Sequence, residues 1–257
     1  MSLIALGVLG SLLAGAATGL GVLPVLFLRL PGPRVQDMLL GFAAGVMLGA
    51  SFFSLILPGL EEAAPRYGGE VGAVFVVAAG ILAGALAIGA VERWAPHEHF
   101  ILGRQGADLV HLRRIWLFVI AITLHNFPEG LAVGVGFGLG DVGHGTSLAL
   151  GIGLQNIPEG LSVALALMTQ GYGRRFAAGV GAMTGLVEPV GGLLGVSAVV
   201  VAAPLLPWGL AFAAGAMIFV ISHEIIPETH RRGFQTTATG GLLAGFVVMM
   251  ILDVSLG

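Results

Sequence analysis

Two copies of one ten-residue sequence carry the side chains of this chain that are best suited to bind a cation. Residues 124–133 read LHNFPEGLAV and residues 154–163 read LQNIPEGLSV, with seven of ten positions identical. Within each copy two polar residues lie four and three positions before the glutamate, so on a helix the three side chains share one face. The candidate ligands that this spacing brings together are His125, Asn126, Glu129, Gln155, Asn156 and Glu159.

Each copy lies in the middle of an apolar stretch long enough to cross a bilayer. A carboxylate at that depth costs roughly 2.5–3.5 kcal/mol on insertion scales, so it needs a compensating partner. A third acidic residue, Glu188, precedes Pro189 in a later apolar stretch, and no basic residue lies at comparable depth. Protons or divalent cations must therefore neutralise these carboxylates.

The donor types narrow the choice of cation. The chain has no Cys, so any ligands are imidazole, carboxylate, amide and carbonyl groups. A mixed nitrogen and oxygen set suits Zn²⁺, Fe²⁺, Mn²⁺ or Cd²⁺ better than Cu⁺, and the histidine favours Zn²⁺ over Mg²⁺ or Ca²⁺. Purely structural roles stay open: a protonated glutamate pair, amides that hydrogen bond between helices, and a Glu188 that supports the kink at Pro189.

The composition that surrounds these residues is that of a polytopic membrane protein. Of 257 residues, 56% are hydrophobic and only 10% are charged, which excludes an ordinary soluble domain. We predict an all-α, single transmembrane domain over residues 1–257, because no polar stretch is long enough to fold separately. The eight predicted spans are 3–28, 37–59, 71–92, 115–138, 146–169, 176–201, 206–226 and 235–256.

Arginine placement predicts the orientation. With the N-terminus outside, ten of the eleven arginines lie in cytoplasmic connections and Arg66 alone lies outside, so both termini are expected to be extracytoplasmic. This fits a multi-pass protein of a plasma membrane. Glycines at four-residue spacing in the second, third and sixth spans predict close helix packing, with a homodimer as a further expectation. No basic patch suited to nucleic acid is present.

The fourth and fifth spans are consecutive, so they cross the membrane in opposite directions. Their repeated sequence therefore forms an inverted repeat, and Pro-interrupted helices in such repeats usually mark the binding site of a transporter. Pro128 and Pro158 lack an N–H and free a carbonyl in each helix, while Gly130 and Gly160 permit close backbone approach.

With these motifs, the chain resembles the ZIP (Zrt-, Irt-like protein) family of divalent metal transporters, and most closely its bacterial branch with His-Asn-x-Pro-Glu-Gly in the fourth span. The resemblance extends over the whole chain. It implies one metal site from His125, Glu129, Gln155 and Glu159. It implies an adjoining second site from Asn126, Asn156 and Glu188, bridged by Glu129 and Glu159. Relatives carry Asp at the position of Asn156, so the second site here has less charge.

Three polar segments outside the repeat have two readings each. The resemblance suggests that His223 and Glu224, with Glu228 one turn further on, line an exit path for the metal, whereas a solvated helix end is the alternative. The connection at about 93–114 carries His97, Glu98, His99 and His111, which either capture released metal or form an ordinary polar loop. For Asp141 and His144, in a short outer connection, a turn is favoured over a role in metal entry.

We therefore expect a transporter that imports a divalent transition metal by alternating access, with Zn²⁺ as the first choice. The chain has no phosphate-binding loop of the Walker type, so ATP is not expected as a partner. The alternative is an intramembrane metal-dependent hydrolase. It is disfavoured because the two repeat copies contain a single histidine and His223-Glu224 is followed by no histidine at the required spacing.

Overall fold

The computed structural model describes residues 1–257 except 28–30, 95–96, 100–102, 106–113, 170–171 and 257, and it omits the side chains of some further residues, including His125. The described part is helical apart from one short hairpin. Its elements are α1 (Leu3–Phe27), α2 (Pro33–Gly49), η1 (Ala50–Ile56), α3 (Leu57–Ala63), α4 (Glu70–Trp94), β1 (His97–His99), β2 (Gly103–Gln105), α5 (Arg114–Gly138), α6 (Val142–Thr169), α7 (Arg174–Thr184), η2 (Gly185–Val187), α8 (Glu188–Val201), η3 (Ala203–Leu205), α9 (Leu206–Val220), η4 (Ile221–Ile225), α10 (Ile226–Thr229) and α11 (Gln235–Leu256).

These elements form the predicted polytopic architecture. Seven helical segments of the described chain are long and apolar enough to span a membrane, and α5, with 25 residues, is an eighth helix of matching length. Three spans are compound: α2 continues through η1 into α3, α7 through η2 into α8, and α9 through η4 into α10. The predicted spans match within a few residues, and the structure extends several of them because their polar ends remain helical.

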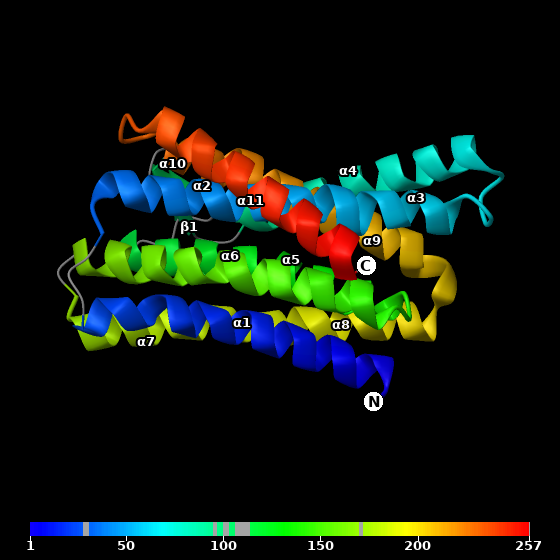
Figure 1. Ribbon diagram of the computed structural model, residues 1–257, viewed down its shortest axis with the longest axis horizontal. Helices are drawn as coiled ribbons and strands as arrows, with labels where there is room; N and C mark the ends of the chain where they lie inside the picture. Colours follow the sequence, from blue (N-terminus) through cyan, green and yellow to red (C-terminus); the bar gives the residue numbers. More distant parts are fainter. Residues whose placement is uncertain (28–30, 95–96, 100–102, 106–113, 170–171, 257) are drawn as a thin grey trace.

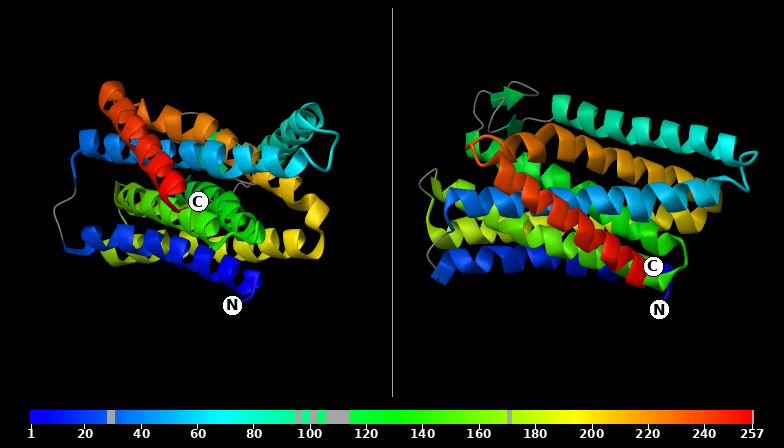
Figure 2. Two further views of the ribbon diagram at one scale, coloured as in Figure 1. Left: turned by 45° about the vertical axis from the view of Figure 1, so that its right-hand side comes forward. Right: turned by 45° about the horizontal axis from the view of Figure 1, so that its top comes forward.

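The helices form two groups (Figure 1). In one group, α1 packs against α5, α6, α7 and α8; in the other, α2 packs against α11 and α4 packs against α9. Helices α5 and α6 lie between α1 and the second group, and they contact α9 and α2 respectively. The two repeat copies thus lie in the interior of the bundle, and the turned views of Figure 2 show the same arrangement.

Glycines allow the helices within each group to approach closely. A Cβ atom on Gly45 of α2 would lie 1.9 Å from the carbonyl oxygen of Leu242 in α11, and one on Gly84 of α4 would lie 2.0 Å from that of Phe212 in α9. Between α1 and η2, a Cβ on Gly185 would lie 2.3 Å from the carbonyl oxygen of Gly15. The predicted small-residue stripes therefore pack within the chain.

Prolines explain where two spans change their helical winding. The π-helical segments η1 and η4 precede Pro58 and Pro227, which lie in the first turns of α3 and α10. A proline offers no N–H to the carbonyl four residues earlier, so the winding widens and some bonds shift to the i−5 carbonyl. In η1 this shift is visible, because the N–H of Leu57 bonds to the carbonyl of Phe52.

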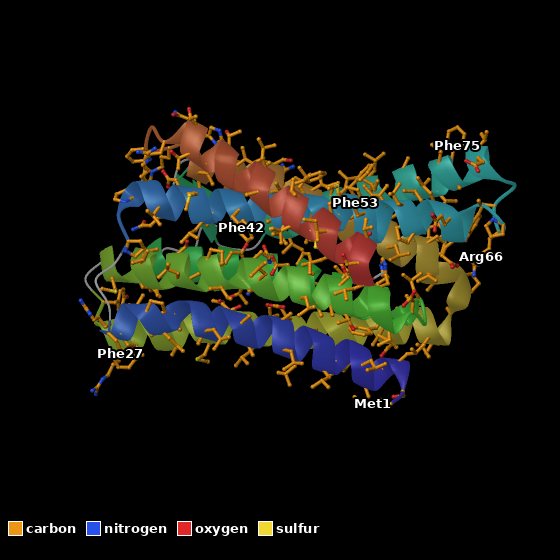
Figure 3. The ribbon with its side chains drawn as sticks, in the orientation of Figure 1. Met1, Phe27, Phe42, Phe53, Arg66 and Phe75 are labelled. Atoms are coloured by element: carbon orange, nitrogen blue, oxygen red, sulfur yellow. The ribbon has the colours of Figure 1, made fainter. Side chains whose placement is uncertain are left out.

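Both termini lie toward the same end of the bundle (Figure 1). Arg66, the one arginine predicted to lie outside, is at the end of Met1, whereas Phe27 lies at the opposite end (Figure 3). An even number of crossings and the arginine asymmetry together place the termini outside. At the opposite end, β1 and β2 pair antiparallel, with Glu98 opposite Arg104. The segment expected to be a polar loop thus contains a short hairpin, while His111 lies outside the described residues.

Candidate metal centre

The polar side chains of the repeat are buried in the bundle as predicted. Asn126 and Glu129 of α5 are 1% and 0% exposed, and Glu159 of α6 is 7% exposed. Gln155 and Asn156 of α6 are fully buried as well. Helices α5 and α6 run through Pro128 and Pro158 without a break, so both sets of donors stay on continuous helix faces.

A third helix, α8, contributes Glu188 to this group of residues. It is the first residue of α8, directly after the 3-10 turn η2, and it is fully buried. The carboxyl groups of Glu129, Glu159 and Glu188 lie close enough to influence one another electrostatically. Three acidic side chains from α5, α6 and α8 therefore converge, as predicted. Among the described residues, no ion pair links Glu129 or Glu188 to an arginine.

Asn156 is the hub of a hydrogen-bonded amide network. Its Nδ2 donates to Oε1 of Glu188 at 2.7 Å and to the carbonyl oxygen of Ala14 in α1 at 2.8 Å. Its Oδ1 accepts a hydrogen bond from Nε2 of Gln155 at 2.8 Å. The orientation of the Asn156 amide follows from chemistry, because only the NH₂ group can satisfy the Ala14 carbonyl.

Other oxygens of the same group have no hydrogen bond. Both carboxylate oxygens of Glu129, Oε1 of Gln155 and Oε2 of Glu188 are buried and unpaired among the described residues, as are both polar atoms of the Asn126 amide. The Gln155 side chain nevertheless lies close enough to Glu129 to interact with it. Buried polar atoms are normally paired, so this concentration of unpaired oxygens fits a site built for a cation.

The described residues contain no ready-made cluster of three or more His, Asp or Glu side chains at metal-binding distance. The centre instead combines carboxylates with amide oxygens, and His125 lies on α5 one turn before Glu129 with its side chain outside the described part. Carboxylate and amide oxygens suit divalent cations, and an imidazole would add preference for transition metals. The arrangement can strip water from such an ion and hold it between antiparallel helices.

Helix α1 is part of this centre, although sequence analysis did not predict it. A Cβ on Gly15 would lie 3.3 Å from the carboxyl carbon of Glu188, and a Cβ on Gly160 would lie 2.2 Å from the carbonyl oxygen of Thr18. The buried face of α1 includes Ser11, Ala14, Gly15 and Thr18. Their i, i+3, i+4, i+7 spacing is a small-residue stripe that could have indicated a close packing partner for the repeat.

The repeat glycines confirm the predicted backbone approach. A Cβ on Gly130 would lie 2.1 Å from the carbonyl oxygen of Glu188, and one on Gly191 would lie 2.5 Å from that of Phe127. Only glycine lets α5 and α8 cross at this separation. The crossing holds Glu188 against the α5 copy of the repeat.

The residues suggested for an exit path lie at the end where the α9–η4–α10 span finishes. His223 and Glu224 are half-buried in η4, and the His223 ring packs 5.1 Å from that of Phe219 between centroids. Glu228 forms ion pairs with Arg231 at 3.4 Å and Arg232 at 3.9 Å. Arginines therefore balance the charge of Glu228, whereas no arginine of the described part of the chain pairs with Glu129 or Glu188.

Asp141 and His144 adopt the turn that sequence analysis favoured. Oδ1 of Asp141 accepts hydrogen bonds from the backbone N–H of Gly143 at 2.8 Å and of His144 at 3.2 Å, which caps the start of α6. The His144 ring is buried, and its Nε2 lies 2.7 Å from the carbonyl oxygen of Ser54. Among the described residues its contacts are thus structural.

Comparison with known proteins agrees with this architecture. Residues 101–253 match the family model described as ZIP Zinc transporter. The chain is 50% identical to the zinc transporter GufA of Myxococcus xanthus over 98% of this chain and 99% of that protein. It is also 50% identical to the zinc transporter ZIPB of Bordetella bronchiseptica, over 97% of this chain and 81% of that protein.

A less similar relative also matches over nearly the whole length of both proteins. The zinc transporter ZIP11 of Homo sapiens is 35% identical over 97% of this chain and 96% of that protein. These relatives are transporters, so they support transport and not the hydrolase alternative. The chain is a multi-pass membrane protein that belongs to the ZIP family of zinc transporters.

Proposed function

We propose that this ZIP-family transporter carries zinc through the centre formed by α5, α6 and α8. Glu129 and Glu159 are the principal ligands, Gln155 contributes its free Oε1, and His125 completes the first site. The observation that carries the proposal is the group of buried oxygens of Glu129, Gln155 and Glu188 that have no hydrogen-bond partner among the described residues. A divalent cation there offsets the electrostatic cost of burying them.

The adjoining polar groups belong to the same centre. Among the described residues, both polar atoms of Asn126 and one carboxylate oxygen of Glu188 have no hydrogen-bond partner. Together with Glu129 and Glu159 they offer oxygens for an ion beside the first site. The charge favours this use, because three carboxylates exceed what one divalent cation neutralises. Cd²⁺, Fe²⁺ and Mn²⁺, which accept the same donors, are expected as competing ions.

In import, the ion enters from the outer side, where the termini lie, and leaves at the cytoplasmic, arginine-rich end. We place the exit beside His223 and Glu224, half-buried donors in η4. Movement of one helix group against the other would provide alternating access, because the repeat helices lie where the two groups meet. A homodimer remains a prediction, since the glycine stripes considered for it pack within the chain.

Zinc uptake into vesicles that contain the purified protein tests the proposal. Replacement of both Glu129 and Glu159 by Ala should abolish saturable uptake, because the two principal ligands are gone. Glu62→Ala is the matched control: Glu62 is partly exposed and pairs with Arg66 at 2.5 Å, so uptake should stay at the wild-type level. Unchanged uptake by the double variant would overturn the assignment of the site.

A further inference from the structure

The two asparagines of the repeat occupy equivalent positions but differ in their hydrogen bonds. Asn126 is buried, and both its Oδ1 and its Nδ2 are unpaired among the described residues. Asn156 is equally buried, but its Nδ2 and Oδ1 are engaged in three hydrogen bonds of 2.7–2.8 Å. The repeat is therefore symmetric in sequence and asymmetric in bonding.

We infer that Asn156 is a positioning residue for the metal ligands and not itself a ligand, whereas Asn126 is free to ligate. This inference rests on the proposed function of the centre. To coordinate an ion through Oδ1, Asn156 would have to share the atom that holds Gln155. If the Asn156 amide were turned around, its oxygen would face the carbonyl oxygen of Ala14, which cannot donate a hydrogen bond. It would also lose the hydrogen bond that its Nδ2 donates to Glu188.

The hydrogen bonds of Asn156 determine which atoms of its neighbours remain free. Gln155 donates a hydrogen bond through Nε2 to Asn156, so its Oε1, the atom that a metal requires, has no partner in the part of the chain that the structure describes. Glu188 accepts through Oε1, and its Oε2 is likewise unpaired within that part. Removal of partners that orient metal ligands typically costs 10–100-fold in metal affinity.

Backbone atoms of helix α1 hold the side chain of Asn156 in place. The Ala14 carbonyl accepts from Asn156 as a backbone atom, so its position does not depend on a side-chain rotamer. Gly15 lies against the Glu188 carboxyl group, and a Cβ there would also lie 2.3 Å from the Gly185 carbonyl oxygen. Asn156 is thus held by backbone on one side and holds two metal-facing side chains on the other.

A double-mutant cycle separates positioning from ligation. Zinc dissociation constants would be measured by equilibrium dialysis on the purified full-length chain in detergent, for wild type, Asn156→Ala, Gln155→Ala and the double variant. We expect each single change to weaken zinc binding by about 10–100-fold. Once Gln155 is Ala, the further change Asn156→Ala should weaken zinc binding by a much smaller factor than it does in the wild type. The reason is that Asn156 acts in part through Gln155.

Asn126→Ala is the matched control for the cycle. Its effect should multiply with that of Gln155→Ala, as expected for two independent ligands. Multiplicative effects for Asn156 as well would show that it does not act through Gln155, and the loss of one bound zinc per chain in Asn156→Ala would show that it is a ligand. Either result would overturn the inference. Melting without zinc checks folding, and Asn156→Ser, which is also too short to reach all three partners, repeats the cycle if the alanine variant does not fold.

The same zinc-binding measurement distinguishes an error in the role of Asn156 from an error in the location of the metal centre. If Glu129→Ala with Glu159→Ala binds zinc as wild type does, the centre itself is wrongly placed. If that variant loses zinc while the Asn156 cycle is multiplicative, the centre stands and the role of Asn156 is wrong.

Discussion

Nε2 of His144 in α6 lies 2.7 Å from the carbonyl oxygen of Ser54 in η1. Pro58 is four residues after Ser54 and offers no N–H to that carbonyl, so the imidazole satisfies a group that the proline leaves without its usual partner. A carbonyl only accepts, and the proton must therefore be on Nε2. The hydroxyl of Ser54 donates in turn to Asp253 of α11. One residue thus connects both helix groups at the outer end.

Loss of this connection should lower stability. We expect His144→Leu to reduce the free energy of unfolding by about 1–3 kcal/mol, the cost of leaving a buried carbonyl unpaired. Thermal melts in detergent measure it. Thr146→Ala, in the same helix, removes only a local bond to the Val142 carbonyl and should change little. Equal changes in the free energy of unfolding for the two variants would show that the hydrogen bond between His144 and Ser54 contributes nothing to stability.

Adjacent glycines of α11 offer a test of the helix packing. A Cβ on Gly241 would lie 2.2 Å from the Met38 carbonyl oxygen of α2, whereas one on Gly240 would have no atom within 4 Å. Gly241→Ala should therefore destabilise the protein by about 1–3 kcal/mol through overpacking. Gly240→Ala should be neutral or slightly stabilising, because alanine favours the helix. The melting temperatures of the two variants would coincide if α2 and α11 did not cross here.

The buried Asp37 provides a test of charge compensation at the arginine-rich end. Arg232 lies 3.5 Å from this carboxylate, whose side chain is 1% exposed, and also donates to Gln36. We expect Arg232→Ala to lower the free energy of unfolding by about 1–3 kcal/mol, less than for a fully buried pair because Arg232 is 33% exposed.

Adding Asp37→Asn to Arg232→Ala should recover part of that loss, because no charge is then left uncompensated. Arg66→Ala, which breaks an exposed pair with Glu62, is the control and should cost under about 1 kcal/mol. Absence of any recovery in the Asp37→Asn double variant would show that the Asp37 charge is balanced by other groups.

Zinc should stabilise the wild type and not Glu129→Gln. Free ligand at about 100 times its dissociation constant stabilises the bound protein by about 2.7 kcal/mol. The Gln variant keeps the shape of the side chain but loses the charge, so its melting temperature without zinc should equal or exceed that of the wild type. Glu62→Gln should retain the full zinc shift. A zinc shift of wild-type size in Glu129→Gln would exclude Glu129 as a principal ligand.

The spans and the shared helix faces of the repeat residues could be predicted because each depends on local rules, whereas a place for Glu188 beside Glu129 and Glu159 was implied by the family resemblance. Hydropathy marks a span of about twenty residues, and i, i+3 and i+4 spacing places side chains on one helix face. The inverted repeat predicted that α5 and α6 carry the site together, and Gly130 and Gly160 predicted close backbone approach. These features are confirmed by the burial of the three glutamates and by the contact of Gly130 with Glu188.

The bonding of individual atoms could not be predicted from the sequence. Asn126 and Asn156 occupy equivalent positions, yet only Asn156 meets the Ala14 carbonyl. That difference depends on α1, which lies more than 100 residues away in the chain and breaks the symmetry of the repeat. The role of His144 at Ser54 likewise depends on a tertiary contact that no short motif specifies. The pairing of β1 with β2 was not predicted either, because the segment was read as a polar loop.

An anomalous-scattering map from crystals grown with Zn²⁺ or Cd²⁺ tests the central assignment most directly. The account predicts a metal peak between α5, α6 and α8, within coordination distance of Glu129, Glu159 and Oε1 of Gln155, and no bond from the metal to Asn156. A map with no peak among these residues, in crystals whose metal peaks lie elsewhere along the chain, would contradict it.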